Sequence, residues 1–327
     1  MYKICKKSEF FLYKYLYASS LVEEEVSSPR IWKNYIEQYS DSIETDNYGT
    51  VIGIINKYNS FKIVIEAHVE ARQWYINYIS DDGIIYVACV DKKIAPSKRV
   101  NIHTKNGIID GVFFYKISEK LGYERNFFLI DIGASTLKEV ENLGINVGCR
   151  VTSQYDFFIL NNKYYVGSAH KICGFIIAEV MRLIKKNNVL LPYGLYVINT
   201  GRKKETPPAN IVIKIDVCNE TYPLMRNKKI NGEIKCGLGP VINYSPSINN
   251  NLREKIIFLA KKNNLSFQRL VNNQDYFSRG IYALISIPIR YRYTTVEMAI
   301  KKDIENCINI MYETLKNIDP SEKFNYF

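Results

Sequence analysis

The chain has 327 residues, of which 47% are hydrophobic and 24% charged, and it carries a formal net charge of +11. This length suits one large domain with an insertion, or two domains, and the composition is that of a globular protein with a buried core. The lysines are scattered, and the longest basic runs, GRKK at 201–204 and RNKK at 226–229, have loop composition. The charge therefore does not predict a nucleic-acid partner.

The cysteines and the N-terminal segment bear on the compartment. Seven cysteines are spread along the chain without a C-x-x-C pair, which argues against a disulfide framework or a zinc knuckle and fits a reducing environment. Charged residues interrupt the apolar run at the N-terminus and no A-x-A site follows it, unlike a signal peptide. No stretch approaches the roughly 18 apolar residues of a membrane span. We expect a cytoplasmic protein that does not contact membranes.

The first third of the chain predicts helices, then strands. Helices are expected over residues 8–18 and 28–40, and the second follows SSP, where serine can cap a helix and proline fits its first turn. TVIGIIN (50–56) and FKIVIEA (61–67) predict a hairpin of two buried strands. From residue 74 to about 166, short β-rich runs separated by turn residues are typical of a small β barrel.

The rest of the chain alternates between strands and helices. These segments lie at 172–188 (helix), 194–199 (strand), 210–218 (strand), 253–264 (helix), 281–289 (strand) and 295–318 (helix). The alternation predicts an α/β mixed sheet with helices on both faces. The expected organisation is a discontinuous α/β domain, residues 1–73 and 164–327, interrupted by a β-barrel-like insertion at 74–163.

Six segments are similar, in order, to the motifs of one family. SSLVEEEVSS is similar to G-x-S-x-x-E-E-x-V, TDNYGTVIG to D-x-x-G-N-V-I-G, and EAHVE stands where that family has A-H-M-D-E. LIDIGASTLKEVENLGINVG (129–148) matches the segment that returns from the insertion. CGLGPVIN (236–243) resembles L-G-K-G-P-A-I, and ALISIPIRYRYTTVEM (283–298) resembles A-L-I-S-I-P-T-R-Y-I-H-S-P-V-E-M. The chain thus resembles, nearly end to end, the tetrahedral (glutamyl/lysyl-type) aminopeptidases, which are di-metal exopeptidases.

This resemblance implies an aminopeptidase-like α/β fold with a barrel-like insertion, and self-association into dimers and tetrahedral dodecamers. It also implies a reaction in which two metal ions about 4 Å apart activate a water molecule between them. One carboxylate bridges the two ions, other ligands hold each of them, and a separate glutamate acts as the general base.

One side of such a metal site is preserved in this chain. His68 stands at a strand end where the family has its first ligand, and Asp216 in KIDVC matches another ligand of the same metal. Glu70 occupies the position of the aspartate that orients this histidine. The resemblance therefore implies that His68 and Asp216 are the remaining metal ligands.

The bridging position differs from the family pattern. When YVGSAHKICG (165–174) is aligned with G-K-A-L-D-D-R-x-G-C, Ala169 falls on the bridging aspartate, His170 on its neighbour and Lys171 on the arginine. Imidazole cannot bridge two cations through two oxygens as a carboxylate does. Cys173 follows in this segment, and we interpret it as a packing residue.

The remaining ligand positions are also substituted. Gly201 and Arg202 fall on the two glutamates of Q-E-E-x-G, one of them the general base, and the nearest acid is Glu205. Tyr293 replaces the last histidine ligand. An arginine roughly 4 Å from a metal ion would repel it by several kcal/mol at an effective dielectric near 20. We expect either no metal or one weakly held divalent ion, with zinc the expected metal, and not two.

Three functions fit this pattern. The first is a non-catalytic binding or assembly subunit that associates with itself or with an active paralogue, with a peptide as a candidate ligand. The second is a repurposed enzyme, or a residual single-metal aminopeptidase or amidohydrolase that uses His68, His170 and Asp216; Glu70 and His170 are its candidate catalytic residues. The third is an anion site formed by Lys171, Arg202 and Arg292, against which GRKK also fits a solvated loop.

Overall fold

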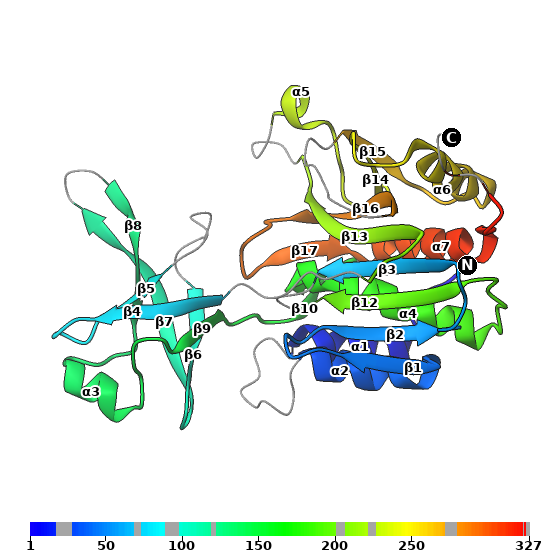
Figure 1. The fold of residues 1–327 in the computed structure, drawn as a ribbon. Coiled ribbons are helices and arrows are strands. Elements are labelled where there is room, and N and C mark those ends of the chain that lie inside the picture. Colours follow the sequence, from blue (N-terminus) through cyan, green and yellow to red (C-terminus); the bar gives the residue numbers. More distant parts are fainter. Residues whose placement is uncertain are drawn as a thin grey trace.

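The computed structural model of the chain describes residues 1–17, 28–68, 73–88, 98–118, 122–200, 207–221, 227–271, 280–322 and 324. These residues form two parts, a mixed sheet with helices packed on it and a closed barrel set to one side of the sheet (Figure 1). No helix of the described residues is long and apolar enough to cross a membrane.

The described part of the large sheet has eleven strands. They are β1 (Ser42–Thr45), β2 (Val51–Ile55), β3 (Lys62–His68), β10 (Phe158–Leu160), β11 (Tyr164–Gly167), β12 (Gly194–Thr200), β13 (Ile211–Asn219), β14 (Val241–Tyr244), β15 (Gln268–Val271), β16 (Ile281–Arg290) and β17 (Glu297–Ile300). Their order is β1-β2-β12-β3-β13-β16-β17-β11-β10, and β14 and β15 extend from β16. The sheet therefore ends, on one side, at β10.

The four central strands, β12, β3, β13 and β16, run parallel to one another. Strands buried on both faces are apolar along most of their length, and β12 is buried at every position. Their carboxyl ends meet at one edge of the sheet, where the ends of open α/β sheets commonly hold ligands. This edge is where the candidate site residues lie.

The helices are α1 (Lys6–Tyr17), α2 (Ser28–Ile36), α3 (Leu137–Asn142), α4 (Ile172–Lys186), α5 (Lys228–Asn231), α6 (Asn250–Lys262) and α7 (Lys301–Asn317), with short 3-10 helices η2 (Glu37–Tyr39) and η3 (Ala169–Lys171). Buried residues of α1, α2, α4, α6 and α7 share one core cluster with Ile211, Ile213 and Ile215 of β13. A smaller cluster includes Val212 of the same strand. Alternate residues of β13 thus face two separate cores.

The barrel is closed by β4 (Gln73–Ile79), β5 (Ile85–Ala88), β6 (Lys98–Thr104), β7 (Gly107–Ser118), β8 (Gly122–Asp131) and β9 (Arg150–Ser153), in the order β4-β5-β8-β7-β6-β9. Trp74 and Phe113 pack in its core with ring centroids 5.6 Å apart. The next strand, β10, already pairs with β11 in the large sheet. We therefore propose that the domain boundary lies between the end of β9 and the start of β10.

The predicted fold class, an α/β mixed sheet with helices and an inserted β barrel, is confirmed. The predicted hairpin of 50–56 and 61–67 is wrong, because β12 lies between β2 and β3 and pairs with both. Two buried strands that follow one another in sequence each need a partner on both sides, and local pattern does not identify that partner. The predicted helix at 295–318 begins later, because residues 297–300 form β17.

Candidate functional site

The two predicted metal ligands lie on neighbouring central strands. His68 ends β3, where its backbone pairs with Thr200 of β12. Ala67 pairs with Ile215 of β13, so Asp216 comes one residue beyond this pair. The register thus places Asp216, three residues before the end of β13, beside His68 at the end of β3. Only the backbone of His68 lies within the described part of the chain.

The Asp216 carboxylate is partly exposed and has a cation near each oxygen. Nη2 of Arg292 lies 3.8 Å from Oδ1, and Nζ of Lys214 lies 4.0 Å from Oδ2. Oδ1 also accepts a hydrogen bond from the Val217 N–H at 2.7 Å. Both cations are beyond hydrogen-bond distance, so they act on Asp216 through their charge.

Lys214 was not singled out from the sequence, although its position could have been inferred. It precedes Asp216 by two residues in the same strand, and residues two apart in a strand point to the same face. Its backbone partner in β3 is Glu66. Charges of opposite sign thus lie on neighbouring positions of β3 and β13, where Lys214 lies between Glu66 and Asp216.

His170 is held in the η3 turn by Glu297. Oε2 of Glu297 accepts from the His170 N–H at 3.1 Å and lies 2.9 Å from Nδ1, while Nε2 faces Oγ of Ser168 at 3.5 Å. Oε1 of Glu297 accepts from the Tyr293 N–H at 2.8 Å. Burial raises the pKa of Glu297, but the charge of His170 and these hydrogen bonds outweigh burial and leave the pKa below its ordinary value.

Glu297 belongs to the TTVEM motif that resembles the family, but the sequence did not reveal that it binds His170. With Nδ1 held by Glu297, a metal could reach His170 only through Nε2. Tyr293 adopts the left-handed conformation, with φ of 78°, and its ring lies under the Arg292 guanidinium at 5.0 Å. Tyr293, predicted to stand in place of a histidine ligand, is therefore part of a packed loop.

Lys171 and Ala169 face the interior. Nζ of Lys171 donates to Oγ of Ser28 at the start of α2 and lies 5.8 Å from the ring centroid of Tyr15 in α1. Burial lowers the pKa of Lys171 to about 7. Ala169 is buried in the main core cluster. Lys171 thus points toward the first two helices, whereas Arg292 lies beside Asp216.

The other predicted positions, Glu70, Gly201, Arg202 and Glu205, lie outside the described residues. Within the described part of the chain, no group of three or more His, Cys, Asp or Glu side chains could hold a metal ion. Cys173 is buried, and burial holds the pKa of its thiol well above the ordinary value. This fits the packing role predicted for it.

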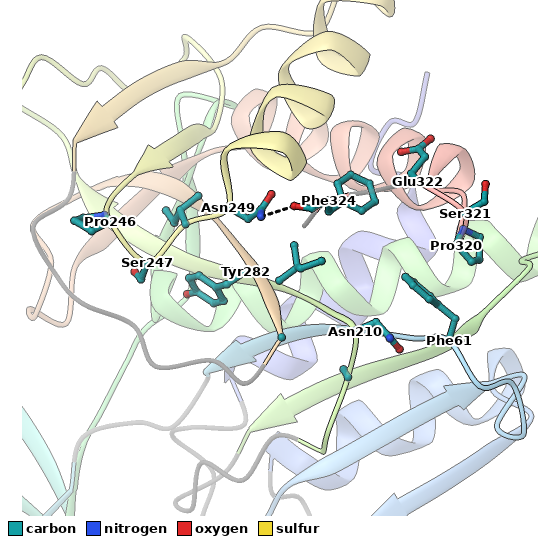
Figure 2. Close-up of a pocket in the computed structure, with 14 residues that line it drawn as sticks. Phe61, Asn210, Pro246, Ser247, Asn249, Tyr282, Pro320, Ser321, Glu322 and Phe324 are labelled. Carbon is teal, nitrogen blue, oxygen red and sulfur yellow. Dashed lines mark hydrogen bonds between the residues drawn. The ribbon is translucent and has the colours of Figure 1, made fainter. Parts of the chain in front are cut away.

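A hollow of about 730 Å³ lies at the opposite edge of the sheet, where β13 and β16 begin. Figure 2 shows Asn210, Tyr282 and Phe61 around it, and Asn249, whose Nδ2 donates to the Phe324 carbonyl at 2.8 Å. The hollow is lined by the starts of the strands, whereas Asp216 lies in the last half of β13 and Arg292 follows the end of β16. It is separate from the candidate site.

The chain matches known proteins along most of its length. The model of the M42 glutamyl aminopeptidase family matches residues 49–310. A putative aminopeptidase of Acetivibrio thermocellus is 25% identical over 90% of this chain and 93% of the relative.

Solved structures share the fold. A TET aminopeptidase from the marine sediment archaeon Thaumarchaeota archaeon SCGC AB-539-E09 superposes with a TM-score of 0.86, at 22% identity, over 96% of this chain and 97% of its own. The TET1 peptidase of Pyrococcus horikoshii, described as assembling into a tetrahedron or a large octahedral shell, has a TM-score of 0.77, at 21% identity, over 95% of this chain and 100% of its own.

Proposed function

Because this chain belongs to the M42 glutamyl aminopeptidase family, we propose that it keeps the aminopeptidase fold without two-metal peptide hydrolysis and acts as a non-catalytic binding or assembly subunit. The observation that carries this proposal is the charge around Asp216. Lys214 and Arg292 lie within about 4 Å of the carboxylate that would have to bind a metal. Their positive charges would repel a divalent cation that approached this carboxylate.

The donors in the described residues do not fit two metal ions. A divalent ion at Asp216 would be repelled by each nearby cation by several kcal/mol at an effective dielectric near 20. Ala169, at the bridging position, has no oxygen in its side chain, and a two-metal site depends on a ligand that bridges both ions. These residues support a site that holds no catalytic pair of metals.

The test combines metal analysis with an assay of hydrolysis. Elemental analysis of the purified protein is expected to give well under two equivalents of zinc, and aminoacyl-p-nitroanilides are expected to remain uncleaved. Added zinc should leave the melting temperature unchanged. A zinc ion bound to the folded protein would raise it, because a ligand at a hundred times its Kd adds about 2.7 kcal/mol of stability. Two tightly held equivalents of zinc together with cleavage would contradict the proposal.

Self-association is the second part of the proposal. The tetrahedral and octahedral assemblies described for Pyrococcus horikoshii TET1, which has the same fold, support a dimer or a dodecamer of this chain. An active paralogue as the partner is the alternative. Native mass spectrometry distinguishes them: a multiple of 38.0 kDa indicates self-association, whereas a second subunit mass indicates a paralogue. A monomer at all concentrations would exclude self-association.

A repurposed enzyme is the second candidate function, and one observation favours it. Ser168, His170 and Glu297 lie in a row, with the imidazole between a hydroxyl and a carboxylate. In such a row the base can accept the hydroxyl proton while the carboxylate orients the ring. This candidate ranks second because Ser168 is only 1% exposed and its contact with His170 is 3.5 Å long.

A fluorophosphonate probe tests this candidate. If Ser168 is an activated nucleophile, the probe should label the native protein, and Ser168→Ala and His170→Ala should each abolish the labelling. Intact folding of the variants can be checked by circular dichroism. If Ser168 remains unlabelled in the folded native protein, the row of side chains only fixes the loop around Tyr293.

A further inference from the structure

The end of the large sheet is exposed and apolar. Phe158, Ile159 and Leu160 make up β10, and their exposed fractions are 47%, 44% and 46%. Among the described strands, β10 pairs only with β11. An edge strand with free backbone groups is a template for pairing with another strand, and proteins usually protect it with charge, proline or a covering element. Successive side chains of a strand point to opposite faces, so these three exposed residues place apolar surface on both faces of the sheet edge.

Aromatic residues of α1 continue this surface. Phe10 and Tyr13 are exposed on α1, and the Tyr13 ring meets the ring of Phe157, directly before β10, at 5.6 Å in an edge-to-face arrangement. We call Phe158, Ile159 and Leu160 together with Phe10 and Tyr13 the β10 edge. Contiguous exposed apolar surface of this kind marks an interaction site.

The charges at the two ends of β10 select the orientation of an added strand. Asp156 lies before β10 and Lys163 lies after it, and both are exposed. If two copies paired in parallel, aspartate would face aspartate and lysine would face lysine. In the antiparallel orientation each Asp156 lies close to Lys163 of the other copy, because the strands run in opposite directions. The apolar centre between them carries no charge to oppose the pairing.

From this we propose that β10 pairs antiparallel with β10 of a second copy of this chain, around a two-fold axis near Ile159, so that two large sheets become one. This rests on the assembly role proposed above and names the surface that serves it. A two-fold interface uses the same patch on both subunits, and this patch is self-complementary in both apolar character and charge. Strand addition supplies backbone hydrogen bonds, and the side chains supply specificity.

The surface beside Ile159 has room for a partner side chain. A hollow of about 280 Å³ is lined by Ile159, Tyr165, Lys301, Glu9, Asn162 and Lys163. Three of its polar groups are already engaged: Tyr165 donates to Glu9 at 2.8 Å, and Lys301 lies 3.4 Å from the same carboxylate oxygen. Because the charges of Glu9 and Lys301 are balanced within one copy, an apolar side chain of the partner can pack beside them.

The first test places a charge on the edge. Ile159→Lys should convert the dimer to monomer at micromolar concentration, with the dissociation constant raised at least tenfold, as measured by sedimentation velocity across a dilution series. Leu190→Lys is the matched control, since Leu190 is 94% exposed and lies far along the chain from β10; it should leave the mass unchanged. Thermal unfolding of both variants confirms that the fold is intact.

The second test exchanges the two end charges. Asp156→Lys and Lys163→Asp should each weaken dimerisation about threefold to tenfold, because each change places like charges together at two symmetry-related points. The double variant should restore the wild-type dissociation constant. A partner that is not a second copy would not produce this restoration.

The outcomes separate this inference from the proposed function. A protein that self-associates with unchanged affinity in all of these variants overturns the β10 pairing but keeps an assembly role on another surface. A protein that is monomeric throughout overturns both the β10 pairing and the proposed self-association. Dissociation by Ile159→Lys in a protein that binds two zinc ions and cleaves peptides supports the β10 pairing and overturns only the non-catalytic proposal.

Discussion

Two carboxylates of this protein, Glu179 in α4 and Asp216 at the site, are both close to cations but are bound very differently. Glu179 is fully buried and accepts from the Tyr2 hydroxyl at 2.5 Å, the Ser8 hydroxyl at 2.8 Å and the Arg182 Nη2 at 2.7 Å. Asp216 is partly exposed, and its cations lie 3.8 and 4.0 Å away. The carboxylate of Glu179 is thus held by several short hydrogen bonds from side chains, whereas the charge of Asp216 is balanced by cations that lie beyond hydrogen-bond distance.

The Glu179 cluster also explains how the N-terminus is held. Tyr2 and Ser8 come from the first eight residues, and Tyr35, which also donates to Glu179, comes from α2. One carboxylate in α4 therefore ties three segments together in the core. Substitutions at Glu179, at Asp303 and at the site around Asp216 test this difference between the carboxylates.

The largest expected effect is at Glu179. Glu179→Ala should lower the free energy of unfolding by about 3 to 5 kcal/mol, because it leaves the Arg182 guanidinium buried without its partner. Urea unfolding monitored by circular dichroism measures the loss. Glu254→Ala, at an exposed residue of α6, is the control and should change stability little. A loss below 1 kcal/mol at Glu179 would contradict a structural role for this cluster.

A smaller effect is expected at Asp303, which is buried with hydrogen bonds but forms no ion pair with the described residues. It accepts from the N–H groups of Gly237 at 2.6 Å and Gly239 at 2.7 Å. Burial, helped by the charge of Glu220, raises the pKa of Asp303 from 3.8 to about 6 despite these bonds and Lys302. Because the folded pKa is above the unfolded one, the contribution to stability is complete below pH 3.8 and is lost as pH rises through about 6.

This loss can be measured. Between pH 4 and 7 the contribution of Asp303 to the free energy of unfolding should fall by about 2 kcal/mol. Subtracting the pH profile of Asp303→Asn, which does not titrate, isolates it from the other carboxylates. If the two profiles run parallel over this range, Asp303 does not have a raised pKa.

At the site, removal of the cations should open Asp216 to a metal. The double variant Lys214→Met, Arg292→Met is expected to bind zinc about tenfold to hundredfold more tightly than the wild type, because two positive charges about 4 Å from the carboxylate are gone. Isothermal titration calorimetry measures the affinity. Lys185→Met, which removes a distant ion pair with Asp41, serves as the control. Equal zinc affinity in all three proteins would mean that these cations do not exclude metal.

The smallest effect is expected from Asp216→Asn. Since the carboxylate is partly exposed and its ion pairs are long, the free energy of unfolding should change by less than about 1 kcal/mol. A loss comparable to that at Glu179 in the same urea experiment would show that Asp216 is a structural anchor and not a loosely balanced site residue.

The sequence predicted the fold well because its motifs are spread over the whole chain, and each fixes a local element. It failed where the outcome depends on strands distant in sequence, as in the expected pairing of β2 with β3. It also missed the partner of His170, because Glu297 lies 127 residues away and is brought close only by the pairing of β11 with β17. Local pattern contains no information on such contacts.

The site shows the same limit. His68 could be placed at the end of a strand, because it follows an apolar run, but only the parallel pairing of β3 with β13 brings Asp216 beside it. The direction of Lys171 could not be predicted, since its long side chain could reach either the site or the core. Lys214 was accessible through strand alternation, but a lysine inside an apolar strand was not an expected feature of a metal site.

The position of β12 between β2 and β3 has a consequence for how the chain folds. Val51 of β2 pairs with Asn199 of β12, so this pairing of the large sheet joins residues 148 apart. Contacts of such long range form slowly, whereas the pairings of the barrel strands between them join residues at most 79 apart. During synthesis the barrel can therefore be complete while β2 and β3 still wait for their shared partner, and both apolar strands need protection until the ribosome has delivered residue 200.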